Sequence, residues 1–409
     1  MKIRLKRTLK RYFFDTHRAL TPAETLGEAE KLKEKVGITR MEDITALDKL
    51  NIPVYSASRP EAEEGAVSVY TGKGLTREQA RVSVIMEAIE RYSGELKARD
   101  RAKFLFESYD GGRGEKQKVD PASLILSGLS TIGPSSKLEW CEGYDLLREE
   151  EVLVPANAVF HPYVSNRGER LFRSDTNGIA SGNNIEEAIF HGITEVIERD
   201  ALSYVELKKN AGKQIEIDEG DGMIFELKER LESAGVIPHF WYIPSDTGFA
   251  TVALALDNES KDASLLVYGA GTHSDPQIAT IRAITEAAQS RVMQIESMRR
   301  DAMKATSARL MSYDAIKKRN RYWFEDKDKD KGNGNGKEEK VKLDELPKRA
   351  TETIDGDIAV ALDKLRRVVN RVIVVDVTRE EIGVPVVRAI IPGFEVYARN
   401  PERVGSRYR

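Results

Sequence analysis

NIEEAIFHGITEVIER, residues Asn184–Arg199, is one of three stretches in this chain that share a single design. The other two are TREQARVSVIMEAIER at Thr76–Arg91 and DPQIATIRAITEAAQSR at Asp275–Arg291. Each stretch begins with a residue type that caps helix N-termini, and Pro276 occupies the favoured first helical position of the third. The three stretches are therefore predicted to be helices.

A line of polar residues follows one face of each predicted helix. Positions seven, eleven and fourteen after the caps hold Ser83, Glu87 and Glu90 in the first helix, His191, Glu195 and Glu198 in the second, and Arg282, Glu286 and Gln289 in the third. At about 100° per residue, these positions fall within an arc of roughly 60°. The rest of the first helix is apolar nearly all round, which is typical of a buried helix.

Buried carboxylates repel one another and lose hydration, so they persist where they are protonated or meet cations. Mg²⁺ is the natural counter-charge, because it binds one or two carboxylates together with phosphate oxygens. A single ExxER motif would instead indicate a solvated helix face, with Arg91 and Arg199 as surface partners. Three motifs in one register favour a shared metal–phosphate site.

A short strand-like run precedes each helix, at Val67–Tyr70, Leu171–Arg173 and Leu265–Tyr268. Glycine-containing loops are predicted next, at residues 71–74, 177–182 and 269–273. Glycine lets backbone N–H groups approach an anion, and the following helix N-terminus adds a favourable dipole. Each loop alone also fits a plain strand-to-helix turn. Neither GxxxxGK[ST] nor GxGxxG occurs here, so any nucleotide site is built in another way.

Several separated motifs resemble the nucleotide-binding signatures of the YcaO family. They are Ser83-x3-Glu87-x2-Glu90-Arg91, Asn183-x3-Glu187-x7-Glu195-x2-Glu198-Arg199 and Arg282-x3-Glu286-x2-Gln289-x-Arg291, with TGKGLT, TNGIASGN and VVDVTREEIGVPVVRAIIPGFE around them. The resemblance extends from about residue 18 to about residue 395. Members of this family use ATP to activate a backbone amide oxygen of a peptide, and a nucleophile then gives azoline rings, thioamides or amidines.

The resemblance implies a set of ligands for ATP and Mg²⁺. The nucleotide would be bound by Ser83, Glu87, Glu90, Asn183, Glu187, Glu195, Glu198, Arg199 and Arg282, and Mg²⁺ by Glu87, Glu90, Glu195 and Glu198. Arginines neutralise phosphate oxygens, whereas Ser83 and Asn183 would supply neutral hydrogen bonds. Glu187 fits a capping box as well as a nucleotide ligand. Lys73 and Arg18 are further phosphate candidates, and the resemblance names no catalytic base.

The end of the chain bears on the nucleophile. It lacks the PxPxP tail of many azoline-forming members, and no fused peptide-binding domain is expected. This combination resembles stand-alone archaeal members linked to thioglycine formation in the alpha subunit of methyl-coenzyme M reductase. The resemblance then implies peptide thioamidation with sulfide or another sulfur donor, a TfuA-like partner and a homodimer. An azoline-forming cyclodehydratase acting on Cys, Ser or Thr, or a non-catalytic ATP-binding accessory factor, are the alternatives.

Composition limits the remaining classes. The net charge of −3, from 64 basic and 67 acidic residues, gives no electrostatic reason to expect nucleic-acid binding. No run approaches the ~20 apolar residues that span a bilayer, and no secretory signal is recognisable, so a cytoplasmic protein is expected. Cys141, the single cysteine, is predicted to be a buried, inert thiol on a strand at Leu138–Tyr144. His191 fits either a phosphate or substrate contact or a structural hydrogen bond.

The predicted fold class is α/β (α+β), with repeated strand–loop–helix units around one central nucleotide site. Residues 1–62 would form an N-terminal section, 63–323 the core with the ATP/Mg²⁺ site, 324–345 a low-complexity mobile loop, and 346–409 a C-terminal section packing on the core. Further helices are expected near Thr21–Val36, from Met41, and at Glu216–Ala234 and Ile358–Asn370. Further strands are expected at Leu50–Ala57, Phe240–Pro244, Thr251–Asp257, Val372–Val377 and Val384–Ile391, a mobile loop at Glu325–Lys340, and a solvated strand edge at Lys2–Arg11.

Overall fold

The structure is a computed structural model that describes residues 2–111, 116–165, 167–301, 312–325 and 340–408. Its strands form three sheets in the described part of the chain. The first contains β1 (Arg40–Asp43), β2 (Val54–Ser58) and β3 (Val69–Lys73). The second has the order β12 (Val267–His273), β11 (Ala250–Asn258), β10 (Val236–Ile243), β9 (Lys213–Glu216) and β13 (Val341–Lys342).

The third sheet is the largest. Its order is β5 (Gln117–Lys118), β7 (Glu150–Pro155), β6 (Lys137–Asp145), β14 (Ile373–Asp376), β15 (Val386–Ile390) and β8 (Ile179–Ser181), with β4 (Leu105–Ser108) paired to β6. The α-helices are α1 (Pro22–Ala29), α2 (Arg77–Gly94), α3 (Ala98–Arg101), α4 (Ile185–Lys208), α5 (Met223–Ser233), α6 (Pro276–Arg300), α8 (Tyr313–Arg319), α9 (Arg321–Phe324) and α10 (Ile354–Leu365). Among the described residues, no helix has both the length and the apolar character to cross a membrane.

The three repeated stretches are helices α2, α4 and α6, as predicted. Each cap works through its side chain: Thr76 accepts a hydrogen bond from the Gln79 N–H, Asn184 from that of Glu187, and Asp275 from that of Gln277. These bonds satisfy backbone donors that a helix N-terminus otherwise leaves without partners.

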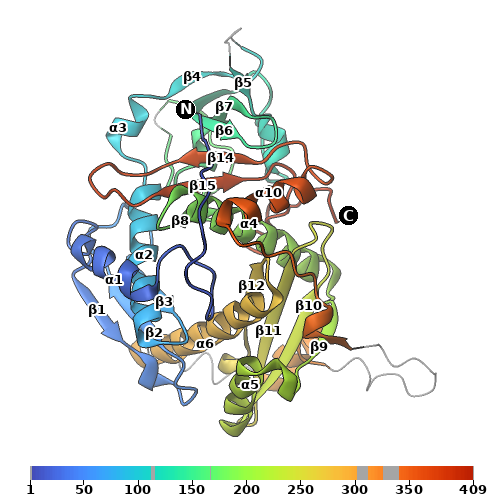
Figure 1. Ribbon diagram of the computed structural model, residues 1–409. Coiled ribbons are helices and arrows are strands. Elements are labelled where there is room, and N and C mark those ends of the chain that lie inside the picture. Colours follow the sequence, from blue (N-terminus) through green and yellow to red (C-terminus); the bar gives the residue numbers. More distant parts are fainter. Residues whose placement is uncertain (1, 112–115, 166, 302–311, 326–339, 409) are drawn as a thin grey trace.

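Strands β3, β8 and β12 directly precede the three helices, and each lies at an edge of its own sheet. The units are connected in a ring, because α2 contacts β8, α4 contacts β12 and α6 contacts β3. Figure 1 shows the three helices and three strands around the middle of the molecule. The threefold repeat in the sequence therefore produces one centre to which all three sheets contribute an edge.

The predicted glycine loops are largely strand, and their glycines serve packing. A Cβ on Gly72 would lie 2.2 Å from the Val84 nitrogen, and one on Gly269 would lie 2.2 Å from the Ala287 nitrogen. Both positions lack a side chain because the following helix packs directly on the strand. Close strand–helix packing is thus the role that the structure shows for Gly72 and Gly269, and the approach of these loops to an anion stays a prediction.

Other differences have local causes. Leu171–Arg173 is not a strand, and the strand before α4 is the three-residue β8 within the predicted loop. The helix expected from Met41 is instead β1, because its backbone pairs antiparallel with β2. Glu216–Ala234 divides into the end of β9, a short 3₁₀ turn and α5. The helix expected at Ile358–Asn370 begins earlier, where Thr353 caps α10 by accepting from the Gly356 N–H.

The strands expected at residues 240–244, 251–257, 372–377 and 384–391 are confirmed as β10, β11, β14 and β15. Of the strand expected at Leu50–Ala57, only the second half is strand, as β2. The helix expected near Thr21–Val36 begins at the predicted place but ends at Ala29, where a 3₁₀ turn at Glu30–Leu32 follows. The predicted mobile loop at Glu325–Lys340 falls almost entirely outside the described residues. Cys141 lies half-buried on β6, with its sulfur 3.6 Å from the Val154 carbonyl oxygen. Burial raises its thiol pKa, which keeps the thiol protonated.

Residues 2–19, here the N-terminal strap, do not form the expected solvated strand edge. The Lys6 N–H donates to Glu186 Oε1 (2.7 Å) at the start of α4, and the Thr8 N–H donates to Asp355 Oδ1 (2.8 Å) on α10. Lys10 is buried, and its Nζ lies 2.7 Å from Asp357 Oδ2. The strap thus passes the first turn of α10 and reaches the centre of the molecule (Figure 1).

Candidate nucleotide and metal site

The central site begins with glutamates of α2 and α4. Glu90 on α2 is buried, and its Oε1 accepts hydrogen bonds from the backbone N–H and hydroxyl of Ser181 on β8 (3.0 and 2.9 Å). The pKa of Glu90 is raised to about 7, mainly by burial, with Glu87 and Glu195 acting in the same direction and Arg91 opposing them. The charges of Glu87 and Glu195 therefore lie close enough to act on the Glu90 carboxyl.

A second group of charges surrounds Glu198 on α4. Burial raises the pKa of Glu198, and the neighbouring Glu286 and Glu195 raise it too. Arg199 and Arg282 act in the opposite direction, with Arg199 Nη1 lying 3.3 Å from Glu198 Oε1. Helices α4 and α6 thus bring three carboxylates and two guanidinium groups together.

Glu286 is a site residue that the sequence analysis did not include among the ligands. Its Oε2 lies 2.5 Å from Nζ of Lys73 on β3. Burial alone would raise its pKa, but Lys73, Arg199 and Arg282 lower the pKa to about 2. Its helical register, equivalent to that of Glu87 and Glu195, is the signal that could have identified it.

Cations gather around His191 on α4. Burial lowers its pKa well below the usual value, and Arg282, Arg18 and Lys73 lower it further. The imidazole is therefore neutral at neutral pH, and its buried Nδ1 has no hydrogen-bond partner among the described residues. Arg199 Nε is also buried and has no hydrogen-bond partner among the described residues. Cationic side chains beside unpaired polar atoms are the environment that a phosphate chain would complete.

Glu187 connects the N-terminal strap to α4. Its Oε2 accepts hydrogen bonds from the backbone and side-chain nitrogens of Asn183 (2.9 Å each), and its Oε1 accepts from the Ala19 N–H (2.6 Å). Arg18 Nη1 lies 3.8 Å from the same carboxylate. Asn183 Oδ1 accepts from the Thr25 hydroxyl (3.0 Å). Glu187 therefore positions Arg18 and Asn183. Its side chain bonds to Asn183 and Ala19 and does not make the reciprocal capping-box bond to the backbone N–H of Asn184.

The strap is the part of the site that sequence reasoning missed. Gln79 at the start of α2 donates to Asp15 Oδ1 (2.5 Å) and to the Tyr12 hydroxyl (2.8 Å). The His17 ring meets the His273 ring edge-on at the end of β12, with centroids 5.2 Å apart. The strap therefore contacts all three repeated units near the helix N-termini. No local sequence pattern predicts these contacts.

The last polar members of α6 have structural partners. Gln289 Nε2 donates to the carbonyl oxygen and hydroxyl of Thr71 (2.7 and 2.8 Å), which joins α6 to β3. Arg291 is buried with Nε 2.8 Å from Asp48 Oδ2. Ser83 lies half-buried on α2, one helical turn before Glu87.

The residues present fit Mg²⁺ held jointly with phosphate. Within the described ranges, no group of three His, Cys, Asp or Glu side chains is gathered as a ready metal site. Mg²⁺ bound through nucleotide phosphates needs only one or two carboxylates per ion. Glu87, Glu90, Glu195 and Glu198 from two helices can supply them, and they remain the predicted metal ligands.

Comparison with known proteins agrees with this arrangement. Residues 71–395 match the family model for YcaO cyclodehydratase, ATP- and Mg²⁺-binding. An uncharacterised protein of Methanothermobacter thermautotrophicus is 46% identical over 96% of this chain and 98% of its own length. An uncharacterised protein in the tfuA 3′ region of Rhizobium leguminosarum bv. trifolii is 33% identical over 93% of this chain and 89% of its own length.

Solved structures show the same fold. The YcaO of Methanopyrus kandleri, bound with AMPPCP and Mg²⁺, is 30% identical, has a TM-score of 0.75 and aligns over 98% of both chains. A heterocyclase in complex with substrate and cofactor has a TM-score of 0.79 at 22% identity, over 97% of this chain and 55% of that one. The family model spans most of the chain and the relatives cover nearly all of it; this protein belongs to the ATP- and Mg²⁺-binding YcaO family.

Proposed function

We propose that this protein is an ATP-dependent enzyme that converts a backbone amide of a peptide or protein into a thioamide. ATP supplies a phosphoryl group to the amide oxygen, sulfide adds to the activated carbon, and phosphate leaves with the original oxygen. The observation that carries the proposal is the meeting of buried carboxylates with Lys73, Arg199 and Arg282 at one centre.

The chain's own residues would position the reactants and balance charge, which is the main contribution of proteins to phosphoryl transfer. Glu87, Glu90, Glu195 and Glu198 would hold Mg²⁺ against the phosphates. Arg199, Arg282, Lys73 and Arg18 would neutralise phosphate oxygens. Neutral His191 would offer its unpaired Nδ1 to a polar group of the nucleotide or the peptide.

Sulfur chemistry and partners are the finer part of the proposal. The Rhizobium relative is named for its place beside tfuA, which supports a TfuA-like partner for this chain. The relatives from Methanothermobacter and Methanopyrus support a methanogen setting, in which the alpha subunit of methyl-coenzyme M reductase is the proposed substrate. We further propose a homodimer.

Mass spectrometry tests the reaction class. A glycine-containing peptide from the proposed substrate is incubated with protein, Mg²⁺, ATP and sulfide, while ADP and phosphate are measured. Replacement of one oxygen by sulfur, matched to ADP and phosphate release, is expected. A mass loss of one water would show an azoline-forming enzyme instead. Bound ATP with an unchanged peptide, also after addition of a TfuA-like protein, would favour the accessory role.

A further inference from the structure

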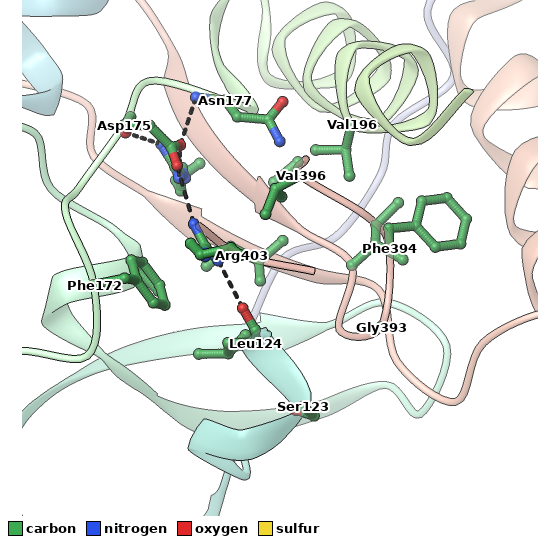
Figure 2. Close-up of a pocket in the computed structure, with 15 residues that line it drawn as sticks. Ser123, Leu124, Phe172, Asp175, Asn177, Val196, Gly393, Phe394, Val396 and Arg403 are labelled. Carbon is green, nitrogen blue, oxygen red and sulfur yellow. Dashed lines mark hydrogen bonds and ion pairs between the residues drawn. The ribbon is translucent and has the colours of Figure 1, made fainter. Parts of the chain in front are cut away.

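A second cavity, of about 50 Å³, lies apart from the nucleotide centre. It is lined by Val196 of α4, by Asn177 before β8, by Arg388 of β15 and by the chain around Phe394 (Figure 2). None of the predicted nucleotide or metal ligands lines it. The cavity is nevertheless close to them in sequence, because Val196 directly follows Glu195 and Asn177 lies six residues before Asn183.

Most polar groups around this cavity already have hydrogen-bond partners. Arg403 donates from Nη1 to Asp175 Oδ2 (3.2 Å), from Nη2 to the Leu124 carbonyl oxygen (2.6 Å) and from Nε to the Ile125 carbonyl oxygen (2.8 Å). Arg388 donates from Nη2 to Asp175 Oδ1 (3.0 Å) and from Nη1 to the Asp175 carbonyl oxygen (2.7 Å).

Two buried atoms are left over. Arg388 Nε and Asn177 Oδ1 have no hydrogen-bond partner among the described residues, although the two residues are only 6% and 7% exposed. Figure 2 shows the Asn177 side chain extending toward Val196, away from Asp175. A buried polar atom without a partner destabilises a fold, so a pair of them beside a cavity points to an occupant.

The chemistry of the pair selects the occupant. Arg388 Nε offers one N–H donor, and Asn177 Oδ1 offers one acceptor. A carboxamide supplies the matching acceptor and donor in one neutral group. A carboxylate would face the oxygen of Asn177, and the two arginines that could attract it are already paired with Asp175 and backbone carbonyls. An ammonium group would face both arginines. The remaining walls, including Phe172, Val196 and Phe394, suit the methylenes of a side chain.

A neighbouring groove points to the source of this group. A larger groove of about 390 Å³, beside residues 127–132 and 169–173, shares Phe172 and Arg403 with the cavity. The cavity itself has room for a few water-sized groups, whereas the groove has the size of an ordinary ligand site. A polypeptide in the groove could therefore place one side chain in the cavity.

We propose that this cavity binds the carboxamide side chain of an asparagine or glutamine in the peptide on which the protein acts. The proposal rests on the proposed function for the identity of the ligand as a peptide. It adds a recognition site, beside but separate from the nucleotide centre, that reads one residue of the substrate.

Ligand-observed NMR without ATP tests the site independently of any reaction. The probes are acetyl-Gly-Gln-Gly-N-methylamide, the same peptide with Glu or Leu in the middle, and acetamide. The Gln peptide is expected to bind at least about tenfold more tightly than the other three, a difference of about 1.4 kcal/mol. Asn177→Leu, which removes the acceptor, and Val396→Phe, which fills the cavity from its C-terminal wall, should each abolish this preference. Thermal unfolding checks that both variants are folded.

Equal binding of the three peptides, or a preference that survives both substitutions, would overturn the proposal. Acetamide binding as tightly as the Gln peptide would overturn the peptide source. A crystal structure with the Gln peptide that shows only an ordered water between Asn177 and Arg388, or binding at crystal concentration only, would also overturn it. Carboxamide binding without any thioamide product would count against the proposed function alone, whereas equal turnover of peptides lacking Asn and Gln would count against this recognition site alone.

Discussion

Glu90 shows why the centre of the molecule is suited to bind a cation. Its carboxyl is buried, and burial raises its pKa to about 7, so it is about half protonated at neutral pH in the metal-free protein. The charged form becomes populated as pH rises through this value. A cation that binds the charged form therefore competes with a proton.

This competition predicts proton release on binding. Mg²⁺ and ATP should displace a proton from Glu90 at pH 6 to 7, and apparent affinity should rise with pH across that window. Calorimetry in two buffers with different ionisation enthalpies measures the released protons. Glu90→Gln should lose this release. A wild-type protein whose binding enthalpy is independent of buffer would contradict the assignment.

The assignment of four glutamates as Mg²⁺ ligands also predicts the effect of removing single carboxylates. Glu87→Gln and Glu198→Gln should each weaken Mg²⁺-dependent ATP binding at least about 100-fold, with little change in unfolding temperature, because each substitution keeps the shape and removes a ligand charge. Glu78→Gln, on the exposed first turn of α2, is the matched control and should bind normally. Unchanged ATP affinity in both site variants would contradict the assignment of these carboxylates as Mg²⁺ ligands.

At the scale of elements, the strand glycines set how closely each helix packs. Gly72→Ala should destabilise the protein by more than about 3 kcal/mol, because its Cβ would meet backbone atoms of α2 that cannot move aside. Gly128→Ala should change stability by less than about 0.5 kcal/mol, since nothing lies within 4 Å of its Cβ. Denaturant unfolding of both variants checks the contrast, and equal stabilities would disprove it.

The same elements show what sequence could and could not predict. Caps and a polar line in one register are local patterns, so α2, α4 and α6 were predictable together with the glutamates on them. Strand β8 was missed, because three residues carry too little pattern to be recognised. The glycines beside it have two readings, anion approach or tight packing, and only the position of the following helix decides between them.

At the scale of the whole molecule, three sheet edges and the N-terminal strap enclose one centre. The bond from the Ala19 N–H to Glu187 joins residues 168 positions apart. Such a contact depends on the assembled ring rather than on local sequence, and no periodicity could reveal it. The sequence therefore predicted the helices that carry the site but not the strap that positions Arg18.

The strap predicts a remote effect on nucleotide binding. Lys10→Met would leave the buried Asp357 carboxylate without its cation, at a cost of about 3–5 kcal/mol. It should also weaken ATP binding, because the strap that positions Arg18 is released. Lys348→Met, which removes an exposed partner of Asp275, is the control and should change neither property much. Calorimetry with ATP measures the effect; wild-type affinity in Lys10→Met would show that the strap plays no part in the site.

The most direct test follows the oxygen atom of the amide. A substrate peptide carrying a heavy oxygen isotope at the reacting amide is converted with Mg²⁺, ATP and sulfide, and the released phosphate is analysed by mass spectrometry. If the amide oxygen is phosphorylated, the label must appear in inorganic phosphate, in equal amount to thioamide. Thioamide formation with the label in water and none in phosphate would contradict the proposed activation.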